Sequence, residues 1–120
     1  MNLTPQDQEL IDVATSLIKR NFLLGKHHVG ASVRMSNGKV YAAVHLESKT
    51  VDVCAEEVAI GMAASNGEKE IDTIVAVTMR DVEKPTVIPP CDTCKELINF
   101  YGPDAWVIVS ANEKRKVKDV

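Results

Sequence analysis

The spacing of hydrophobic positions changes several times along the chain, and each spacing predicts one kind of element. Between residues 5 and 20 the apolar side chains recur at helical spacing, at Leu10, Ile11, Val13, Ala14, Leu17 and Ile18. Thr4 and Pro5 are residue types that favour the start of a helix. Gly25 indicates that the helix has ended. We therefore expect an N-terminal helix with one apolar face packed on a sheet.

Two strands joined by a tight turn are expected next. Residues 29–35 and 40–46 have strand character, and Asn37-Gly38 lies between them. Asn-Gly favours a two-residue hairpin turn because both turn positions adopt positive φ angles. The two strands are therefore expected to be antiparallel neighbours.

The rest of the chain alternates helices with buried strands. We expect, in order, a helix over 54–65, a strand over 71–79, a loop over 80–90, a helix over 91–101, a strand over 105–109 and a short strand around Val117. The run from Ile74 to Val77 is apolar throughout, which is typical of a strand covered on both faces. This order predicts an α/β fold, a three-layer α/β/α sandwich with a mixed sheet. The length predicts one domain, 1–120.

Composition and charge argue against several classes of protein. The net charge is −3, and the one basic run lies at residues 114–118. Binding to phosphate backbones requires clusters of Lys and Arg, so we expect no polymeric nucleic acid as partner. No apolar run approaches the ~20 residues that span a bilayer, so no membrane partner is expected. Residues 1–7 lack the basic and apolar regions of a secretory signal, which predicts a cytoplasmic protein.

All three cysteines lie in two short motifs at predicted helix starts. Cys54-Ala55-Glu56 begins one helix, and Pro90-Cys91-Asp92-Thr93-Cys94 begins the next. An odd number of cysteines cannot all pair internally, which favours thiol or metal chemistry in a reducing compartment. If the two helix starts face each other, three thiols converge at two positive dipole ends, which are expected to lower their pKa values. We therefore predict a zinc site on Cys54, Cys91 and Cys94 with its fourth position open to water.

Glu56 is the candidate catalytic residue. It lies two residues after Cys54, close enough to reach the open metal position, and it is not needed as a ligand. A glutamate in this place can accept a proton from water and return protons to a ring and a departing amine. The order Cys-Ala-Glu followed by Pro-Cys-x-x-Cys is a form of the signature of zinc-dependent nucleoside and nucleobase deaminases.

Two other interpretations of the cysteines stay open. Cys91 and Cys94 alone could form a redox dithiol, although such sites follow a strand and require no distant Cys-Ala-Glu. A structural zinc site requires four ligands, and the fourth would be a histidine: His27, His28 or His45. A carboxylate at position 56 distinguishes the catalytic interpretation, because a structural site has no use for it.

With these motifs the chain resembles the small, single-domain cytidine deaminases. The resemblance covers nearly the whole chain and rests on residues 29–31, 37–38, 44–47, 54–56, 60, 90–94 and 107–109. It implies a five-stranded sheet, one zinc per subunit on the three cysteines, and Glu56 as proton shuttle. It also implies that the backbone amides of Ala55 and Cys91 approach the base and the attacking water. A homotetramer is implied as well, with a homodimer as the alternative.

Departures from the family pattern concern the substrate. Typical members have Asn-x-Glu after the hairpin, where both side chains hold a ribose hydroxyl, and this chain has His45-Leu46-Glu47. His45 can still donate one hydrogen bond, so His45 and Glu47 are candidate substrate residues; a strand-end histidine without function is the alternative. Typical members have Arg after the catalytic glutamate, where this chain has Glu57. The zinc centre is then expected either to be more anionic or to have another cation, His27 or Arg34, offset the thiolate charge.

These observations predict a zinc-dependent hydrolytic deaminase. We expect it to convert cytidine or deoxycytidine to the uridine product and ammonia, as a step of pyrimidine salvage. One alternative is a modified cytosine nucleoside, such as blasticidin S or an N4-substituted cytidine. The other is a zinc-binding module without catalysis. We also expect that part of the base-stacking surface that the family's C-terminal segment forms is either missing or supplied by a neighbouring subunit.

Overall fold

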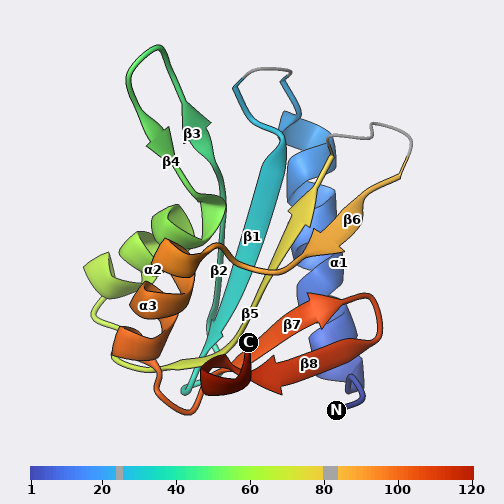
Figure 1. Ribbon diagram of the computed structural model, residues 1–120, viewed down its shortest axis with the longest axis vertical. Helices are drawn as coiled ribbons and strands as arrows, with labels where there is room; N and C mark the ends of the chain where they lie inside the picture. Colours follow the sequence, from blue (N-terminus) through green and yellow to red (C-terminus); the bar gives the residue numbers. More distant parts are fainter. Residues whose placement is uncertain (24–25, 80–83) are drawn as a thin grey trace.

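The computed structural model describes residues 1–23, 26–79 and 84–120, and its elements form three layers (Figure 1). One helix, α1 (Pro5–Asn21), covers one face of a sheet, while α2 (Ala55–Ser65) and α3 (Asp92–Tyr101) lie on the other face. The predicted α/β/α sandwich is confirmed. Gly25, predicted to follow the first helix, lies outside the described residues.

The sheet is mixed, as predicted. The strands that form it are β1 (Val29–Met35), β2 (Val40–Val44), β5 (Ile71–Thr78), β6 (Thr86–Ile88), β7 (Trp106–Ser110) and β8 (Glu113–Lys116). Their order is β2-β1-β5-β7-β8, and β6 pairs with β5 beside this path. The pair β5–β7 is parallel and the other pairs are antiparallel. A separate two-stranded ribbon of β3 (Leu46–Glu47) and β4 (Asp52–Val53) projects from the body beyond the start of α2 (Figure 1).

Three details differ from the sequence predictions. Within the described residues the sheet has six strands rather than five. The additional strand is β6, which lies in the predicted loop over 80–90 and pairs with the end of β5. The strand predicted over 40–46 ends at Val44, and His45 separates it from β3. The last strand precedes Val117, which instead begins a short 3₁₀ helix, Val117–Asp119.

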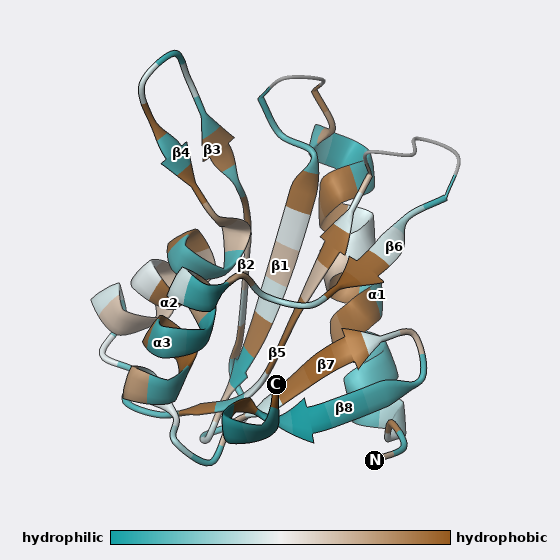
Figure 2. Ribbon diagram, in the orientation of Figure 1, coloured by the Kyte–Doolittle hydropathy of each residue, from teal (hydrophilic) through white to brown (hydrophobic). Residues whose placement is uncertain are grey.

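The core lies on both faces of β5, the central strand. Ile74 and Ala76 belong to the cluster beneath α2 and α3, whereas Val75 and Val77 belong to the cluster beneath α1. Successive side chains of a strand point to opposite faces, so an uninterrupted apolar run serves both layers. The hydropathy colouring of Figure 2 shows β5 and β7 as hydrophobic and the edge strand β8 as hydrophilic. Charged side chains on an edge strand discourage pairing with other sheets.

Candidate active site

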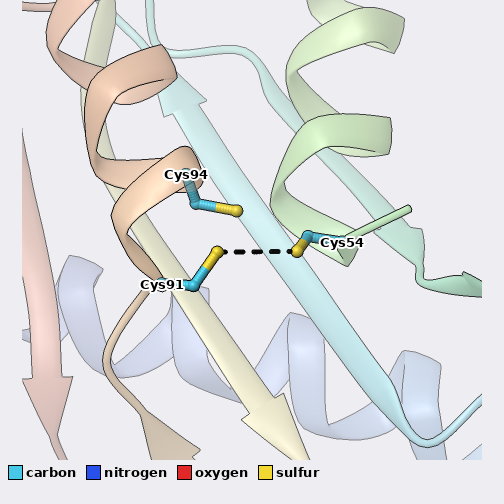
Figure 3. Close-up of side chains that lie close together, drawn as sticks. All are labelled: Cys54, Cys91 and Cys94. Atoms are coloured by element: carbon cyan, nitrogen blue, oxygen red, sulfur yellow. Dashed lines mark hydrogen bonds between the residues drawn. The ribbon is translucent and has the colours of Figure 1, made fainter. Parts of the chain in front are cut away.

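The starts of α2 and α3 face each other and bring the three cysteines together (Figure 3). Cys54 is the N-cap residue of α2, Cys91 is the N-cap residue of α3, and Cys94 lies in the first turn of α3. Their sulfur atoms all lie within 4.8 Å of one another. The sequence prediction that two distant motifs converge at two helix starts therefore agrees with the geometry.

The spacing of these sulfurs suits a zinc ion. The Sγ atoms of Cys54 and Cys91 are 3.8 Å apart, and the three thiols are free. Zn–S bonds of about 2.3 Å in a tetrahedral arrangement also separate two sulfurs by about 3.8 Å. Cys94 is buried, Cys54 is half-buried and Cys91 is exposed, so the group opens to solvent on one side. Three ligands with an open side are the donor set of a catalytic zinc rather than a structural one.

The prediction that helix dipoles lower all three thiol pKa values is wrong for two of them. Burial raises the pKa of Cys54 to about 12, and burial together with the charge of Glu56 raises the pKa of Cys94. Burial also acts on Cys91, but hydrogen bonds from the Cys94 and Thr93 amides and the neighbouring thiols outweigh it and lower its pKa. Desolvation and mutual repulsion exceed the dipole effect where thiols lie deep. Metal binding has to displace the protons of such thiols.

Glu56 is buried next to the thiols. It is 6% exposed, in the first turn of α2. Burial raises the pKa of its carboxyl group, and the charge of Glu57 raises it further. Glu56 lines the same cleft as Cys54 and Cys91, and its charge contributes to the raised pKa of Cys94. A carboxyl group with a raised pKa can both accept and donate a proton.

Glu57 has a local role that the sequence analysis missed. The amide N–H of Cys54 donates a hydrogen bond of 3.0 Å to Oε1 of Glu57, so this side chain caps the start of α2. A glutamate three residues after the N-cap is the signal that could have revealed it. Arg34 does not offset the charge of the thiolates, because it forms ion pairs with Asp7 and Asp72 and none of these three residues lines the site. His27 donates from Nδ1 to the carbonyl oxygen of His45.

A cleft of about 250 Å³ runs from the cysteines to the β3–β4 ribbon. The described residues that line it are His28, Val29, His45, Glu47, Asp52, Cys54, Ala55, Glu56, Ile88, Pro89 and Cys91. Every residue of the predicted catalytic and substrate sets lies on its wall, and Cys94 alone among the predicted ligands lies behind it. The cleft has a polar, acidic end at the ribbon and a sulfur-rich end at the helix starts.

The hydrogen bonds of His45 select one tautomer of its ring. It is 4% exposed, and its Nδ1 accepts hydrogen bonds from the amides of His28, at 3.1 Å, and Val29, at 3.3 Å. A nitrogen that accepts bears no proton, so the proton of the neutral ring is on Nε2. Nε2 lies 3.3 Å from Oε1 of Glu47 and donates to it. A buried N–H and a half-exposed carboxylate therefore stand side by side on the cleft wall.

The tautomer of His45 bears on a second cluster with metal-ligating residue types. The ligand atoms of His28, His45 and Glu47 also lie within 4.8 Å of one another. Histidine ligands bind metal through a nitrogen without a proton while the other nitrogen donates to an acceptor. At His45 the arrangement is the reverse, because Nδ1 accepts and Nε2 carries the proton. The cysteines are therefore the better place for the metal, and the histidine cluster suits a hydrogen-bonding ligand.

An α/β/α sandwich in which two helix starts bring three thiols and a buried glutamate to one cleft is the arrangement of a zinc-dependent hydrolytic deaminase. The family model of the cytidine and deoxycytidylate deaminase zinc-binding region matches residues 4–110. The chain belongs to this family, and zinc is its cofactor.

Named relatives agree with this assignment. A blasticidin-S deaminase of Bacillus cereus is 45% identical over 119 residues, which cover 94% of this chain and 85% of that protein. The cytidine deaminase of Mycobacterium leprae has a TM-score of 0.80 at 17% identity, over 98% of this chain and 97% of that one. The cytidine deaminase of Burkholderia pseudomallei has a TM-score of 0.76 at 21% identity, over 98% and 95%. At these identities the structural likenesses show the fold.

The helices of the described residues are too short or too polar to cross a membrane.

Proposed function

We propose that the protein hydrolyses the exocyclic amine of a cytosine nucleoside, with Glu56 as the proton carrier and Cys54, Cys91 and Cys94 as the zinc ligands. Water adds to the amine-bearing carbon of the ring and the amine leaves as ammonia, so the product carries a carbonyl group. The observation that carries the proposal is the position of Glu56, 6% exposed on the wall of the cleft that two of the three converging thiols also line. A redox dithiol or a structural zinc site requires no carboxyl group there.

The chain's own groups divide the work between them. A zinc ion on three protein ligands supplies a Lewis acid that makes water a nucleophile near neutral pH. Glu56 accepts a proton from the attacking water and delivers protons to the ring nitrogen and the departing amine. Its raised pKa suits this exchange, because the carboxyl group has to hold a proton between the two transfers. The buried wall at Ala55 excludes bulk water from that side.

The two ends of the cleft give the substrate one orientation. The backbone amides of Ala55 and Cys91, at the starts of α2 and α3, are proposed to contact the base. The sugar then lies towards the β3–β4 ribbon, where Nε2–H of His45 is a donor and the carboxylate of Glu47 is an acceptor. A hydroxyl group both donates and accepts hydrogen bonds, so one ribose hydroxyl can satisfy both side chains.

Cytidine and deoxycytidine are the substrates we propose first. A modified cytosine nucleoside is the second candidate, and the similarity to a blasticidin-S deaminase at 45% identity favours it. We further propose a cytoplasmic homotetramer of single-domain subunits that acts in pyrimidine salvage. The tetramer is supported by the family resemblance, and a homodimer is the alternative.

An ammonia-release screen tests the proposal. The zinc-loaded protein is assayed for ammonia with cytidine, deoxycytidine, cytosine and blasticidin S, and for methylamine, the amine its hydrolysis releases, with N4-methylcytidine. We expect release from at least one nucleoside and none from free cytosine, because the base alone leaves His45 and Glu47 without a partner. No release from any of the five compounds would contradict the proposal, and release from blasticidin S alone would favour the second candidate.

A further inference from the structure

The three proposed zinc ligands are held in place by different means. Cys91 follows Pro89 and Pro90, whose rings restrict the backbone that leads to it. Cys94 is buried within the first turn of α3. Cys54 instead follows the two-residue strand β4 and is only half-buried. The position of its sulfur therefore depends on how the start of α2 is fixed.

Cysteine is a weak residue for the start of a helix. The preferred N-cap residues carry an oxygen that accepts a hydrogen bond from an amide of the first turn, and sulfur is a poorer acceptor. At the start of α1 the hydroxyl of Thr4 accepts from the amide of Asp7 at 3.2 Å, and the carboxylate of Asp7 accepts from the amide of Thr4 at 3.0 Å. In α2 a cysteine takes the place of the threonine, and Glu57 takes the place of the aspartate. The start of α2 therefore depends more on its acidic side chain.

Two hydrogen bonds fix the peptide groups on either side of Cys54. Oε1 of Glu57 accepts a bond of 3.0 Å from the amide N–H of Cys54, and the carbonyl oxygen of Cys54 accepts one of 3.2 Å from the amide of Val58. Together they hold the backbone of Cys54 and with it the direction of its Cα–Cβ bond. That direction brings its Sγ to 3.8 Å from Sγ of Cys91. A side chain supplies the first of the two bonds, so one substitution can remove it.

The contribution of Glu57 to a metal site lies in its hydrogen bond rather than in its charge. Cysteines bind zinc as thiolates, and a further carboxylate beside them adds repulsion. A neutral amide side chain could accept the same bond without this repulsion. The family pattern has arginine after the catalytic glutamate, and arginine has donors only, so it cannot accept from the amide of Cys54. The contact is therefore a feature of this chain and not of the family pattern.

We propose that Glu57 is a positioning residue for the metal: by holding the amide of Cys54 it places that thiol where one zinc ion can also reach Cys91 and Cys94. This inference rests on the proposed function, from which it takes the three zinc ligands, and it is independent of the substrate. Glu57 is not among the described residues that line the cleft, so it acts through Cys54. Groups that orient metal ligands commonly contribute about ten- to a hundredfold to metal affinity.

Zinc titrations of three variants test the inference. Zinc affinity is measured by competition with a chromogenic chelator for the unmodified protein, Glu57→Ala, Glu57→Gln and Thr4→Ala. Glu57→Ala removes the acceptor and should weaken zinc binding about tenfold or more. Glu57→Gln keeps a carbonyl oxygen in the same place and should retain the affinity of the unmodified protein. Thr4→Ala removes a helix cap in α1, on the opposite face of the sheet, and should leave zinc affinity unchanged.

Bound Co²⁺ gives a second measurement that helix stability alone does not change. Its visible absorption bands depend on the number and geometry of the thiolates around it. We expect the spectrum of Glu57→Gln to match that of the unmodified protein and the spectrum of Glu57→Ala to differ from both. If Glu57→Ala does not fold, Glu57→Met takes its place with the same expected result, because it keeps the length of the side chain and lacks the carbonyl oxygen.

The outcomes separate this inference from the function on which it rests. The inference is overturned if Glu57→Ala binds zinc as tightly as Thr4→Ala, or if its Co²⁺ spectrum is that of the unmodified protein. It is also overturned if Glu57→Gln loses as much affinity as Glu57→Ala, because the charge would then matter and not the hydrogen bond. Failure of the unmodified protein to bind one zinc ion per chain overturns the proposed ligands and the inference with them. Full zinc binding without amine release in the substrate screen overturns the proposed reaction but not the role of Glu57.

Discussion

At the scale of single residues, His45 shows what contacts add to sequence. The chain alone indicates a histidine where related proteins have asparagine and leaves open whether it binds a ligand. The structure adds two backbone amides, from His28 and Val29, that hold Nδ1 and so direct Nε2–H towards Glu47 and the cleft. Those amides are 17 and 16 residues away in the chain, and no local pattern predicts such a contact.

Removing the donor of His45 tests its proposed role. His45→Leu keeps a buried side chain of similar size but cannot donate to a ribose hydroxyl, whereas His45→Asn can. We expect the unmodified protein and His45→Asn to prefer cytidine over 3′-deoxycytidine, and His45→Leu to lose about fivefold of this preference, the value of one hydrogen bond of about 1 kcal/mol. The ratio of the two kcat/KM values is the measurement. An unchanged ratio in His45→Leu would show that His45 is a structural residue.

The cysteines and Glu56 could be predicted because their chemistry follows from residue type and spacing. Two helix starts with thiols and a nearby carboxylate describe the site before any contact is known. The thiol pKa values could not be predicted, because they depend on how deeply Cys94 and Cys54 are buried and on their mutual distance. The capping role of Glu57 can be predicted from the sequence, because a glutamate three residues after the N-cap position is a known helix-start signal.

At the scale of elements, Gly30 sets how closely α1 approaches β1. A Cβ atom added there would lie 2.9 Å from the backbone oxygen of Ala14 and 3.1 Å from Cβ of Ile18. Backbone cannot move aside as a flexible side chain can, so a methyl group would force the helix away from the sheet. The sequence shows a glycine in a strand, and only the packing shows why it is needed.

Gly30→Ala is therefore expected to destabilise the protein by about 1–3 kcal/mol, the usual cost of overpacking a core. Gly61→Ala is the matched control, because an added Cβ at this position in α2 meets no atom within 4 Å. That change should stabilise the helix by about 0.5–1 kcal/mol. Urea unfolding of both variants gives the two free energies. If Gly30→Ala and Gly61→Ala were equally stable, α1 would not pack as closely on β1 as the structure indicates.

Element boundaries were least predictable where tertiary pairing overrides local pattern. Three prolines, at 85, 89 and 90, indicate a loop before α3, yet Thr86–Ile88 pairs with the end of β5. The strand lies between the prolines, so its own amides remain able to pair. The charged sequence of β8 likewise indicates a solvent-exposed tail. Its pairing with β7 instead makes it the edge strand of the sheet.

At the scale of the whole molecule, one buried carboxylate joins three distant segments. Asp7, at 0% exposure in α1, forms ion pairs with Lys114 of β8 at 2.7 Å and with Arg34 of β1 at 3.1 Å. The Thr4 amide also donates to it. Burial opposes ionisation of Asp7, but Lys114, Thr4 and Arg34 outweigh it and lower its pKa from 3.8 to about 2.

A pKa that is lower in the folded state contributes stability above the unfolded value and loses it as the pH falls. Between pH 4 and pH 2 the protein should therefore lose about 2 kcal/mol of unfolding free energy through Asp7. The variant Asp7→Asn should not show this acid-induced loss of unfolding free energy. At pH 7 it should be about 3–5 kcal/mol less stable than the unmodified protein, because Lys114 keeps its buried charge without its partner. Asp12→Asn, at an exposed position of α1, is the control. Unfolding curves of the three proteins from pH 2 to pH 7 make the comparison, and parallel curves would contradict the assignment.

The central claim is that one chain binds zinc through three cysteines and moves protons through Glu56. The most direct measurement is ammonia release from cytidine together with zinc content, for the unmodified protein, Glu56→Gln and the surface control Glu96→Gln. We predict one zinc per chain in all three proteins and a loss of activity of about a hundredfold or more in Glu56→Gln alone, the usual contribution of a general acid–base residue. Full activity in Glu56→Gln with its zinc retained would contradict the account.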